Sequence, residues 1–311
     1  MSGWTERDIP DLSGRTAVVT GANSGIGFQA ARALAEHGAR VVLAVRDPDK
    51  GEAAAERVVM GAAGAQRPEV RRLDLADLGS VRAFAEGFDE PLDLLVNNAG
   101  VMALPRRTTA DGFEMQLGTN HLGHFALTGL LLDRLLERPG ARVVTVSSGA
   151  HRTGRIRFDD LQGERRYQRW LAYGQSKLAN LLFAAELQRR ATAAGLELLS
   201  VAAHPGYAST NLQVRGAQMD GSAIKEQGAL LLNRLVGQSE QMGALPTLYA
   251  ATSPDVRGGG YFGPNGLFEG RGHPRPVGRS GAARDEDVAR RLWKVSEELT
   301  GVRYLSAAVA S

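Results

Sequence analysis

The stretch "RTAVVTGANSGIG", residues 15–27, decides the fold. Its first part is apolar and rich in β-branched residues, which is typical of a buried strand. Gly21, Gly25 and Gly27 follow, where the strand passes into a predicted helix that ends at Gly38. A glycine-rich turn of this kind lets backbone amides approach a pyrophosphate, and the helix N-terminus adds donors and a positive dipole. The pattern predicts a dinucleotide-binding turn, and the alternative is a structural glycine-rich turn.

The alternation of strand and helix continues for about two hundred residues without a break in composition. We expect strands at 15–22, 39–45, 69–75, 92–100, 141–148 and 196–206, and helices at 25–37, 48–60, 77–88, 112–137 and 170–194. This order predicts a parallel sheet covered on both faces, the doubly wound Rossmann-type α/β fold. Residues 1–13 form a polar lead, and 14–311 form a single domain. Within it, 254–281 is expected to be irregular and 284–300 helical.

The composition excludes several classes of function. The 311 residues carry 37 basic and 34 acidic side chains, too even a balance for a nucleic-acid-binding surface. The absence of cysteine excludes disulfides and thiolate catalysis. The polar N-terminus and the lack of a long apolar run predict a cytoplasmic protein without a membrane anchor. His121 and His124 have no suitably spaced carboxylate, so we expect no metal site.

The end of the second strand, "LAVRDP", indicates the cofactor. Proteins of this fold that use NAD place an acid there, whereas those that use NADP place an arginine nearby. Val45 occupies the acid's position and Arg46 follows, which favours NADP(H), although Asp47 complicates this interpretation and Arg46 could be a surface residue. Asp74, after the third strand, could contact the adenine or cap the next helix.

Three residues predict proton-transfer chemistry. Tyr173 and Lys177 share one face of a helix at i and i+4, and Ser148 ends the preceding strand. A phenol has a pKa of about 10, and a nearby ammonium would lower it. The chain contains only four lysines, at positions 50, 177, 225 and 294. A compact lysine can serve both a ribose and a phenol, which the planar arginine fork would do less well.

Together the motifs "TGANSGIG", "NNAG", "TNHLGHF", "VSS" and "YGQSK" resemble those of the short-chain dehydrogenase/reductase family. The resemblance runs from about residue 14 to about 303. Within the family, "HRTGRIRFDDL", "AYGQSKLANLLFAAEL" and the tail "GGYFGPNGLFEGRG" are similar to the retinol dehydrogenase and WW-domain oxidoreductase branch.

The resemblance implies a role for each matching position. Tyr173 would be the general acid or base, Lys177 would bind the nicotinamide ribose and lower the pKa of the tyrosine, and Ser148 would bind the substrate oxygen. Asn120 would hold a water that continues the proton relay, or it would only bend its helix. The implied cofactor-binding residues are Gly21, Asn23, Ser24, Gly25, Ile26, Gly27, Arg46, Asp74, Leu75, Asn98, Ala99, Gly100, Tyr173, Lys177, Pro205, Gly206 and Thr210.

The expected function is therefore an NADP(H)-dependent oxidoreductase that interconverts an alcohol and a carbonyl compound. Residues 207–245 are expected to cover a lipophilic substrate, because "GALLLNRLVG" at 228–237 has the apolar spacing of a helix face. The alternative for this segment is a helix packed on the body. The alternative functions are a non-catalytic NADP sensor or scaffold and a sugar-nucleotide epimerase or dehydratase. The resemblance also implies a homo-oligomer.

Overall fold

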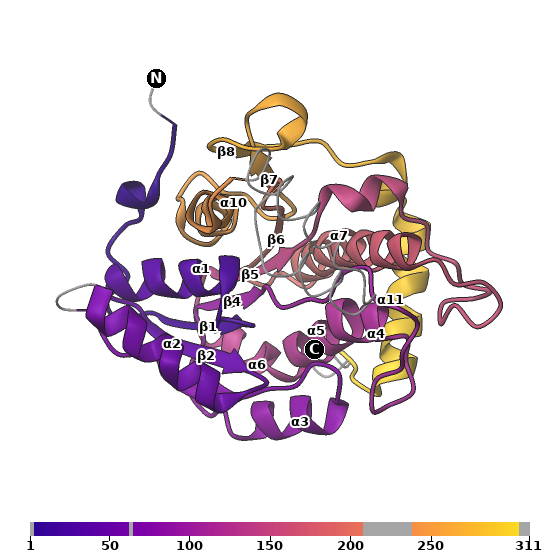
Figure 1. Cartoon of the computed structure of the whole chain (residues 1–311), viewed down its shortest axis with the longest axis horizontal. Helices are drawn as coiled ribbons and strands as arrows, with labels where there is room; N and C mark the ends of the chain where they lie inside the picture. The colour runs from indigo at the N-terminus through magenta and orange to yellow at the C-terminus, as the bar shows by residue number, and fades with distance from the viewer. Residues whose placement is uncertain (1–2, 62–64, 208–237, 305–311) are drawn as a thin grey trace, which may run out of the picture.

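The computed structural model describes residues 3–61, 65–207 and 238–304. An eight-stranded sheet in the order β3-β2-β1-β4-β5-β6-β7-β8 runs through the centre of the molecule (Figure 1). Neighbouring strands from β3 to β7 are parallel, and only the β7–β8 pair in this sheet is antiparallel. The prediction of a single α/β domain with a Rossmann-type sheet is confirmed.

The order of the elements agrees with the predicted alternation through β6, apart from the helix expected over 112–137, and the strands are shorter than expected. The strands are β1 Thr16–Thr20, β2 Arg40–Val45, β3 Glu69–Arg72, β4 Leu94–Asn97, β5 Ala141–Val146, β6 Leu198–Ala203, β7 Tyr261–Pro264 and β8 Pro274–Pro276. The main helices are α1 Gly25–Glu36, α2 Pro48–Gly61, α3 Leu78–Glu86, α5 Gly123–Leu130, α6 Leu132–Leu136, α7 Arg169–Ala193, α10 Glu240–Thr252 and α11 Glu286–Thr300.

Helices cover the sheet on both faces, which explains why the central strands are apolar throughout. Helices α1, α2 and α10 pack on one face, where Ala17 and Val19 of β1 point. Helices α3, α5, α6, α7 and α11 cover the other face, which receives Val18. Every residue of β1 is therefore buried, and the strand can hold the turn that follows it in a fixed position.

The order of the strands reverses direction at β1, whose neighbours are β2 on one side and β4 on the other. In sheets of this kind the crevice beyond the carboxyl ends of the strands, at the point of reversal, receives the ligand. The turns after β1, β2, β4 and β5 all lie at this edge.

The single long helix predicted over 112–137 is wrong. The segment consists of α4 Met115–Leu117, the π-helical turn η2 Gly118–Leu122, α5 and α6. The start is set by Glu114, whose carboxylate accepts hydrogen bonds from the Gln116 and Leu117 amides. A π-turn follows at Asn120, and Leu131 leaves helical geometry with ψ at 3°. Apolar periodicity cannot detect these local changes, because the buried face stays the same.

The irregular segment expected at 254–281 contains two short strands, so that expectation is wrong as well. Strand β7 extends the parallel sheet, and β8 forms its antiparallel edge. A strand of sequence "PRP" carries almost no strand signal, and proline is tolerated there because an edge strand needs few ladder hydrogen bonds. Thr210 and most of the predicted segment 207–245 lie outside the described residues.

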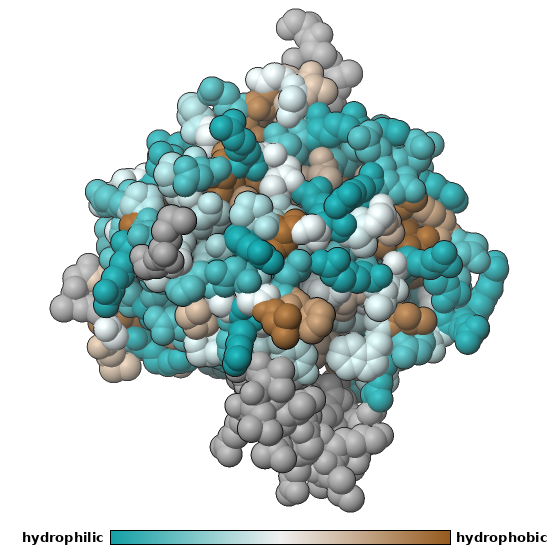
Figure 2. Space-filling model, turned by 90° about the horizontal axis from the view of Figure 1, so that it is seen from above, coloured by the Kyte–Doolittle hydropathy of each residue, from teal (hydrophilic) through white to brown (hydrophobic). Residues whose placement is uncertain are grey.

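The polar lead packs on the domain. Trp4 makes an edge-to-face contact with Tyr249 of α10, and Glu6 pairs with Arg32 of α1. Ile9 and Leu12 are buried in the core. The face shown in Figure 2 is mainly hydrophilic, with separate apolar patches. In the described part of the chain, every helix is too short or too polar to cross a membrane.

Candidate active site

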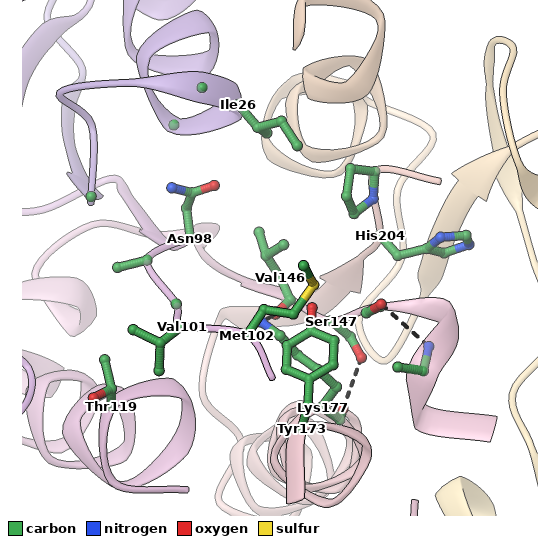
Figure 3. A pocket seen from close by; sticks show the side chains of 18 of the residues that line it. Ile26, Asn98, Val101, Met102, Thr119, Val146, Ser147, Tyr173, Lys177 and His204 are labelled. Carbon is green, nitrogen blue, oxygen red and sulfur yellow. Dashed lines mark hydrogen bonds between the residues drawn. The ribbon is translucent and has the colours of Figure 1, made fainter. Parts of the chain in front are cut away.

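A cavity of about 860 Å³ lies at the carboxyl ends of the strands. It is lined by every described residue of the predicted cofactor set and by Ser148, whereas Asn120 lies just behind its wall. The residues that the sequence assigned to one site therefore come together in the fold. Figure 3 shows Asn98 and Ile26 on one side of the cavity and Tyr173, Lys177 and Ser147 on another.

The glycine-rich turn has the shape that a pyrophosphate requires. Gly21 and Gly25 adopt φ values of 65° and 61°, which favour glycine. A Cβ on Gly21 would come within 2.9 Å of the Ala99 Cβ, and one on Gly27 would collide with the Asn98 side chain. A Cβ on Gly25 would instead enter open space, with Glu240 Oε1 nearest at 3.8 Å. The turn thus leaves an open cradle at the N-terminus of α1 that a side chain would fill, and it fits a dinucleotide.

The end of β2 places two cations on the cavity wall. Arg46 is exposed and forms no ion pair within the described ranges. Lys50, which sequence reasoning missed, pairs with Asp47, and this contact lowers the pKa of Asp47. Val45 is buried and carries no charge. Asp47, which complicated the interpretation of the sequence, is therefore paired with a lysine three residues further along the chain. The sequence could have revealed this spacing.

The structure distinguishes the two predicted roles of Asp74. The N-cap of α3 is Asp77, whose carboxylate accepts from the Gly79 and Ser80 amides. Asp74 lines the cavity, and its Oδ1 accepts a hydrogen bond from the Ala76 amide at 3.0 Å. The helix cap is thus supplied by another residue, and Asp74 stands where a ligand in the cavity can meet it.

Ser148, Tyr173 and Lys177 meet on the cavity wall. Ser148 precedes the short helix η3 Gly149–Thr153, and its hydroxyl accepts from the Ala150 amide at 3.2 Å and lies close enough to Tyr173 to lower the pKa of the phenol. Lys177 Nζ lies 5.8 Å from the centroid of the Tyr173 ring and donates to the Val146 carbonyl at 3.2 Å. The Ser147 hydroxyl donates to the main-chain carbonyl of Lys177 at 2.8 Å, which ties α7 to the end of β5 (Figure 3).

The pKa of Tyr173 shifts in the direction opposite to the expectation. Burial raises it to about 12, and the Ser148 hydrogen bond only partly opposes the rise. Burial also lowers the pKa of Lys177 to about 8. Desolvation disfavours the charged form of both groups, and it is the largest cause of both shifts. The phenol on the cavity wall is thus protonated at neutral pH.

Asn120 is held in one orientation by three hydrogen bonds. Its side chain accepts from the Val101 amide at 2.7 Å and donates to the Val101 carbonyl and to Ser176 Oγ, each at 2.9 Å. Asn120 sits in the π-turn η2, so the residue does coincide with a change of helix geometry. A Cβ on Gly100 would lie 3.1 Å from Asn120 Oδ1 and 3.4 Å from Lys177 Nζ, so both atoms are next to this glycine. Asn120 is therefore a neighbour of the lysine.

His124 links the π-helical turn at Asn120 to the glycine-rich turn, a role that sequence reasoning missed. Its Nδ1 lies 3.0 Å from the Asn120 carbonyl and must donate to it. Its Nε2 then accepts from Thr20 Oγ1 at 2.9 Å, and burial lowers the pKa of His124 to about 4. Thr20 Oγ1 also accepts from the Asn98 and Ala99 amides. Within the described ranges, His, Asp and Glu residues form no cluster of three that could hold a metal.

The segment Pro205–Gly206 follows β6 and lines the cavity. Gly206 has φ 67°, and a Cβ there would meet the Gly270 carbonyl. Gln238 ties this segment from the other side, since its Nε2 donates to the Pro205 carbonyl at 2.6 Å. The backbone is thus fixed between two other parts of the chain.

Apolar side chains form the part of the wall nearest Tyr173. Met102 lies beside the Tyr173 ring in Figure 3. Trp170 packs edge-on against the same ring, with 6.3 Å between the two ring centroids. Trp170 is 50% exposed and Phe268 is 94% exposed, and both line the cavity, as does Tyr207. These residues belong to different segments, and no local motif marks them, which is why the sequence did not reveal this wall.

Known proteins share this architecture and much of this sequence. A family model described as short chain dehydrogenase matches residues 15–220. Retinol dehydrogenase 11 of Homo sapiens is 45% identical over 94% of this chain and 87% of its own.

Two solved structures extend the comparison. The crystal structure of an uncharacterised protein from Mycobacterium paratuberculosis is 50% identical, with a TM-score of 0.81, and the match covers 98% of this chain and 100% of that one. A Beutenbergia cavernae protein assigned as an NAD(P)-dependent gluconate 5-dehydrogenase, with NADP bound at low occupancy, is 27% identical. Its TM-score is 0.61, over 78% of this chain and 91% of that one.

Proposed function

The chain belongs to the short chain dehydrogenase family, and from this membership we propose that it is an NADP(H)-dependent oxidoreductase that interconverts an alcohol and a carbonyl compound. The observation that carries the proposal is the meeting of Ser148, Tyr173 and Lys177 on the wall of a cavity whose other end is a glycine cradle. The bound nicotinamide supplies or accepts the hydride.

Each residue has a distinct task in this proposal. The Ser148 hydroxyl holds the substrate oxygen beside the Tyr173 hydroxyl. In reduction, Tyr173 donates its proton to the carbonyl oxygen, and in oxidation the phenolate takes the proton back from the alcohol. Lys177 stabilises the phenolate and contacts the ribose, and Asn120 and His124 keep the wall behind the lysine in place. Burial raises the pKa of Tyr173, so the phenol is protonated at neutral pH and holds the proton that reduction of a carbonyl consumes.

The preference for NADP(H) is supported by the charges at the end of β2. Arg46 is free to meet a 2′-phosphate, Lys50 adds a second cation, and Asp47 is paired with that lysine. The Beutenbergia cavernae structure contains NADP. Asp74, Asn98 and the Pro205–Gly206 segment would hold the adenosine, ribose and carboxamide ends of the cofactor.

A lipophilic substrate is supported by the wall of Met102, Trp170, Tyr207 and Phe268 around the reaction centre. The human relative is named for retinol, an apolar alcohol. Each methylene that becomes buried against such a wall contributes about 0.8 kcal/mol. The kcat/KM of aliphatic aldehydes should therefore rise with chain length.

The test is NADPH oxidation with a panel of aliphatic, aromatic and steroidal aldehydes and ketones, set beside direct measurement of NADPH binding. Turnover that rises with chain length would support the proposal in full. Binding without turnover of any carbonyl would identify a cofactor sensor, and constant or falling kcat/KM along the series would refute the lipophilic substrate.

A further inference from the structure

The cavity wall contains an ion pair that the proposed reaction does not use. Arg152 Nη2 donates to both carboxylate oxygens of Glu269, at 3.1 and 3.2 Å. Glu269 Oε2 also accepts from His204 Nε2 at 3.1 Å. The direction of this bond is fixed, because His204 Nδ1 accepts from the Gly206 amide and Nε2 must therefore carry the proton. Arg152, Glu269 and His204 all line the cavity.

The carboxylate reaches this position at a conformational cost. Phe268 and Glu269 adopt φ values of 52° and 58°, in the left-handed region that residues with a side chain rarely occupy. Two consecutive residues of this kind persist only where the surrounding structure holds them. Here the Gly270 carbonyl accepts from the Tyr207 amide at 2.7 Å, and Gly266 and Arg271 pair through their backbones. The loop at 266–271 thus presents a charged group to the cavity although a relaxed loop would be easier to form.

The partner of this carboxylate stands close to the reaction centre. Arg152 lies in η3, four residues after Ser148, and its side chain is 47% exposed. Only its Nη2 is engaged, with Glu269 and the Gly278 carbonyl, so Nε and Nη1 have no partner among the residues that the structure describes. An arginine with open donors on a cavity wall would bind a carboxylate strongly. Glu269 opposes this attraction by supplying the negative charge itself.

We propose that Glu269 is a specificity-determining residue, which neutralises Arg152 and so biases the cavity toward uncharged carbonyl substrates and against carboxylate-bearing ones. The inference rests on the proposed oxidoreductase function and deepens it. It concerns the charge of the substrate, which the apolar wall alone leaves open, because an apolar body can carry a carboxylate at one end. Arg169 and Lys177 also line the cavity, but Glu269 is paired with Arg152.

The test compares two aldehydes of the same shape, 4-formylbenzoate and its uncharged methyl ester. In Glu269→Gln the amide can still accept the hydrogen bond from His204, but the charge that balances Arg152 is gone. The ratio of kcat/KM for the anion to that for the ester should rise about tenfold over the wild-type ratio, on the scale of one charge interaction near a protein surface. Binding of 4-formylbenzoate without turnover, measured by calorimetry, should tighten by a similar factor.

Two controls make the result specific. Glu6→Gln removes a carboxylate outside the cavity whose side chain is 16% exposed, against 19% for Glu269. Like Glu269, Glu6 accepts from one arginine nitrogen, Arg32 Nη2, through both carboxylate oxygens. It should leave the ratio of kcat/KM values and the calorimetric affinity for 4-formylbenzoate unchanged. In the double variant Arg152→Gln with Glu269→Gln, the gain for the anion should disappear, because the guanidinium that attracts it is absent.

Unchanged ratio and unchanged affinity in Glu269→Gln would overturn the proposal, and so would a gain that survives the loss of Arg152. Failure of the oxidoreductase proposal gives a different result, namely a wild-type protein that oxidises NADPH with none of the carbonyl compounds. The calorimetric measurement still decides the inference in that case, since it needs no turnover.

Discussion

Tyr173 and Lys177 lie one turn apart on α7, with the ammonium 5.8 Å from the centroid of the phenol ring, and both side chains are buried. The pKa of each group differs from that of the free side chain. Burial raises the pKa of the phenol to about 12 and lowers that of the ammonium to about 8, so the two values, which are nearly equal in water, move apart. Transfer of a proton from the phenol to the amine therefore costs more free energy than in water, by about 1.4 kcal/mol for each unit of separation.

Tyr173→Phe removes the proton donor and leaves the ring in place. We expect kcat to fall by about 10²–10⁴, the usual contribution of positioned proton transfer. NADPH affinity, measured by fluorescence titration, should stay near the wild-type value because phenylalanine keeps the ring and the glycine-rich turn is unchanged. A variant that keeps most of its turnover would exclude tyrosine from the mechanism.

Lys177→Arg should be almost as inactive as Lys177→Ala. The ammonium has one bond to the Val146 carbonyl, and Gly100 approaches so closely that even a Cβ there would lie 3.4 Å from Nζ. The wider guanidinium cannot enter this space without displacing the Asn120 side chain. Steady-state kinetics of both variants check this expectation, and substantial activity in the arginine variant would mean that positive charge alone is sufficient.

Arg46→Ala should weaken NADPH binding and leave NADH binding little changed. Charge-assisted hydrogen bonds to a phosphate contribute about 1.5–3 kcal/mol, so the NADPH dissociation constant should rise about tenfold or more. Lys50→Ala is a useful companion, because it removes a cation and frees Asp47 to repel the phosphate. Equal use of NADH and NADPH by the wild-type protein would contradict the assignment of cofactor.

Acid should destabilise the protein at mildly acidic pH. His121 and His124 are fully buried, and burial lowers their pKa values from 6.5 to about 3 and about 4. Below pH 6.5 the unfolded chain therefore binds more protons than the folded one, and the free energy of unfolding falls as the pH falls. The loss should reach about 2 kcal/mol per histidine at pH 5.

Urea denaturation at pH 7.5, 6 and 5 measures this loss. His121→Gln provides the comparison, since the amide can keep the hydrogen bond to Ser296 but cannot take up a proton. The variant should show a shallower dependence on pH than the wild type. Parallel dependences for the two proteins would show that His121 is not among the groups responsible.

The sequence predicted those parts of the fold that follow from repeated local patterns. Buried parallel strands such as Ala141–Val146 are apolar on both faces, and the helices between them have clear apolar stripes. Strand β8 and the π-turn at Asn120 were missed because their geometry depends on tertiary partners. The edge of β7 makes "PRP" a strand, and the Val101 backbone holds Asn120 in its turn.

The same distinction applies to the site. Residues within motifs, such as Gly25 and Tyr173, could be predicted together, because the βαβ order brings all strand ends to one edge. Met102, Trp170 and Glu269 could not, since each reaches the cavity from a segment without a recognisable pattern. The direction of the pKa shift at Tyr173 was also beyond the sequence, because it depends on how completely the phenol is removed from water.

The packing of the N-terminal lead has a practical consequence. Residues 3–13 hold Trp4 against α10 and Glu6 against α1, and these two helices meet beside the glycine cradle. An expression variant trimmed to begin at residue 14 would expose the apolar surface that Ile9 and Leu12 cover. An aminopeptidase that shortens the chain by about a dozen residues would thus remove packing beside the nucleotide-binding end of the protein. Intact first residues are therefore a sensible quality criterion for any preparation used in assays.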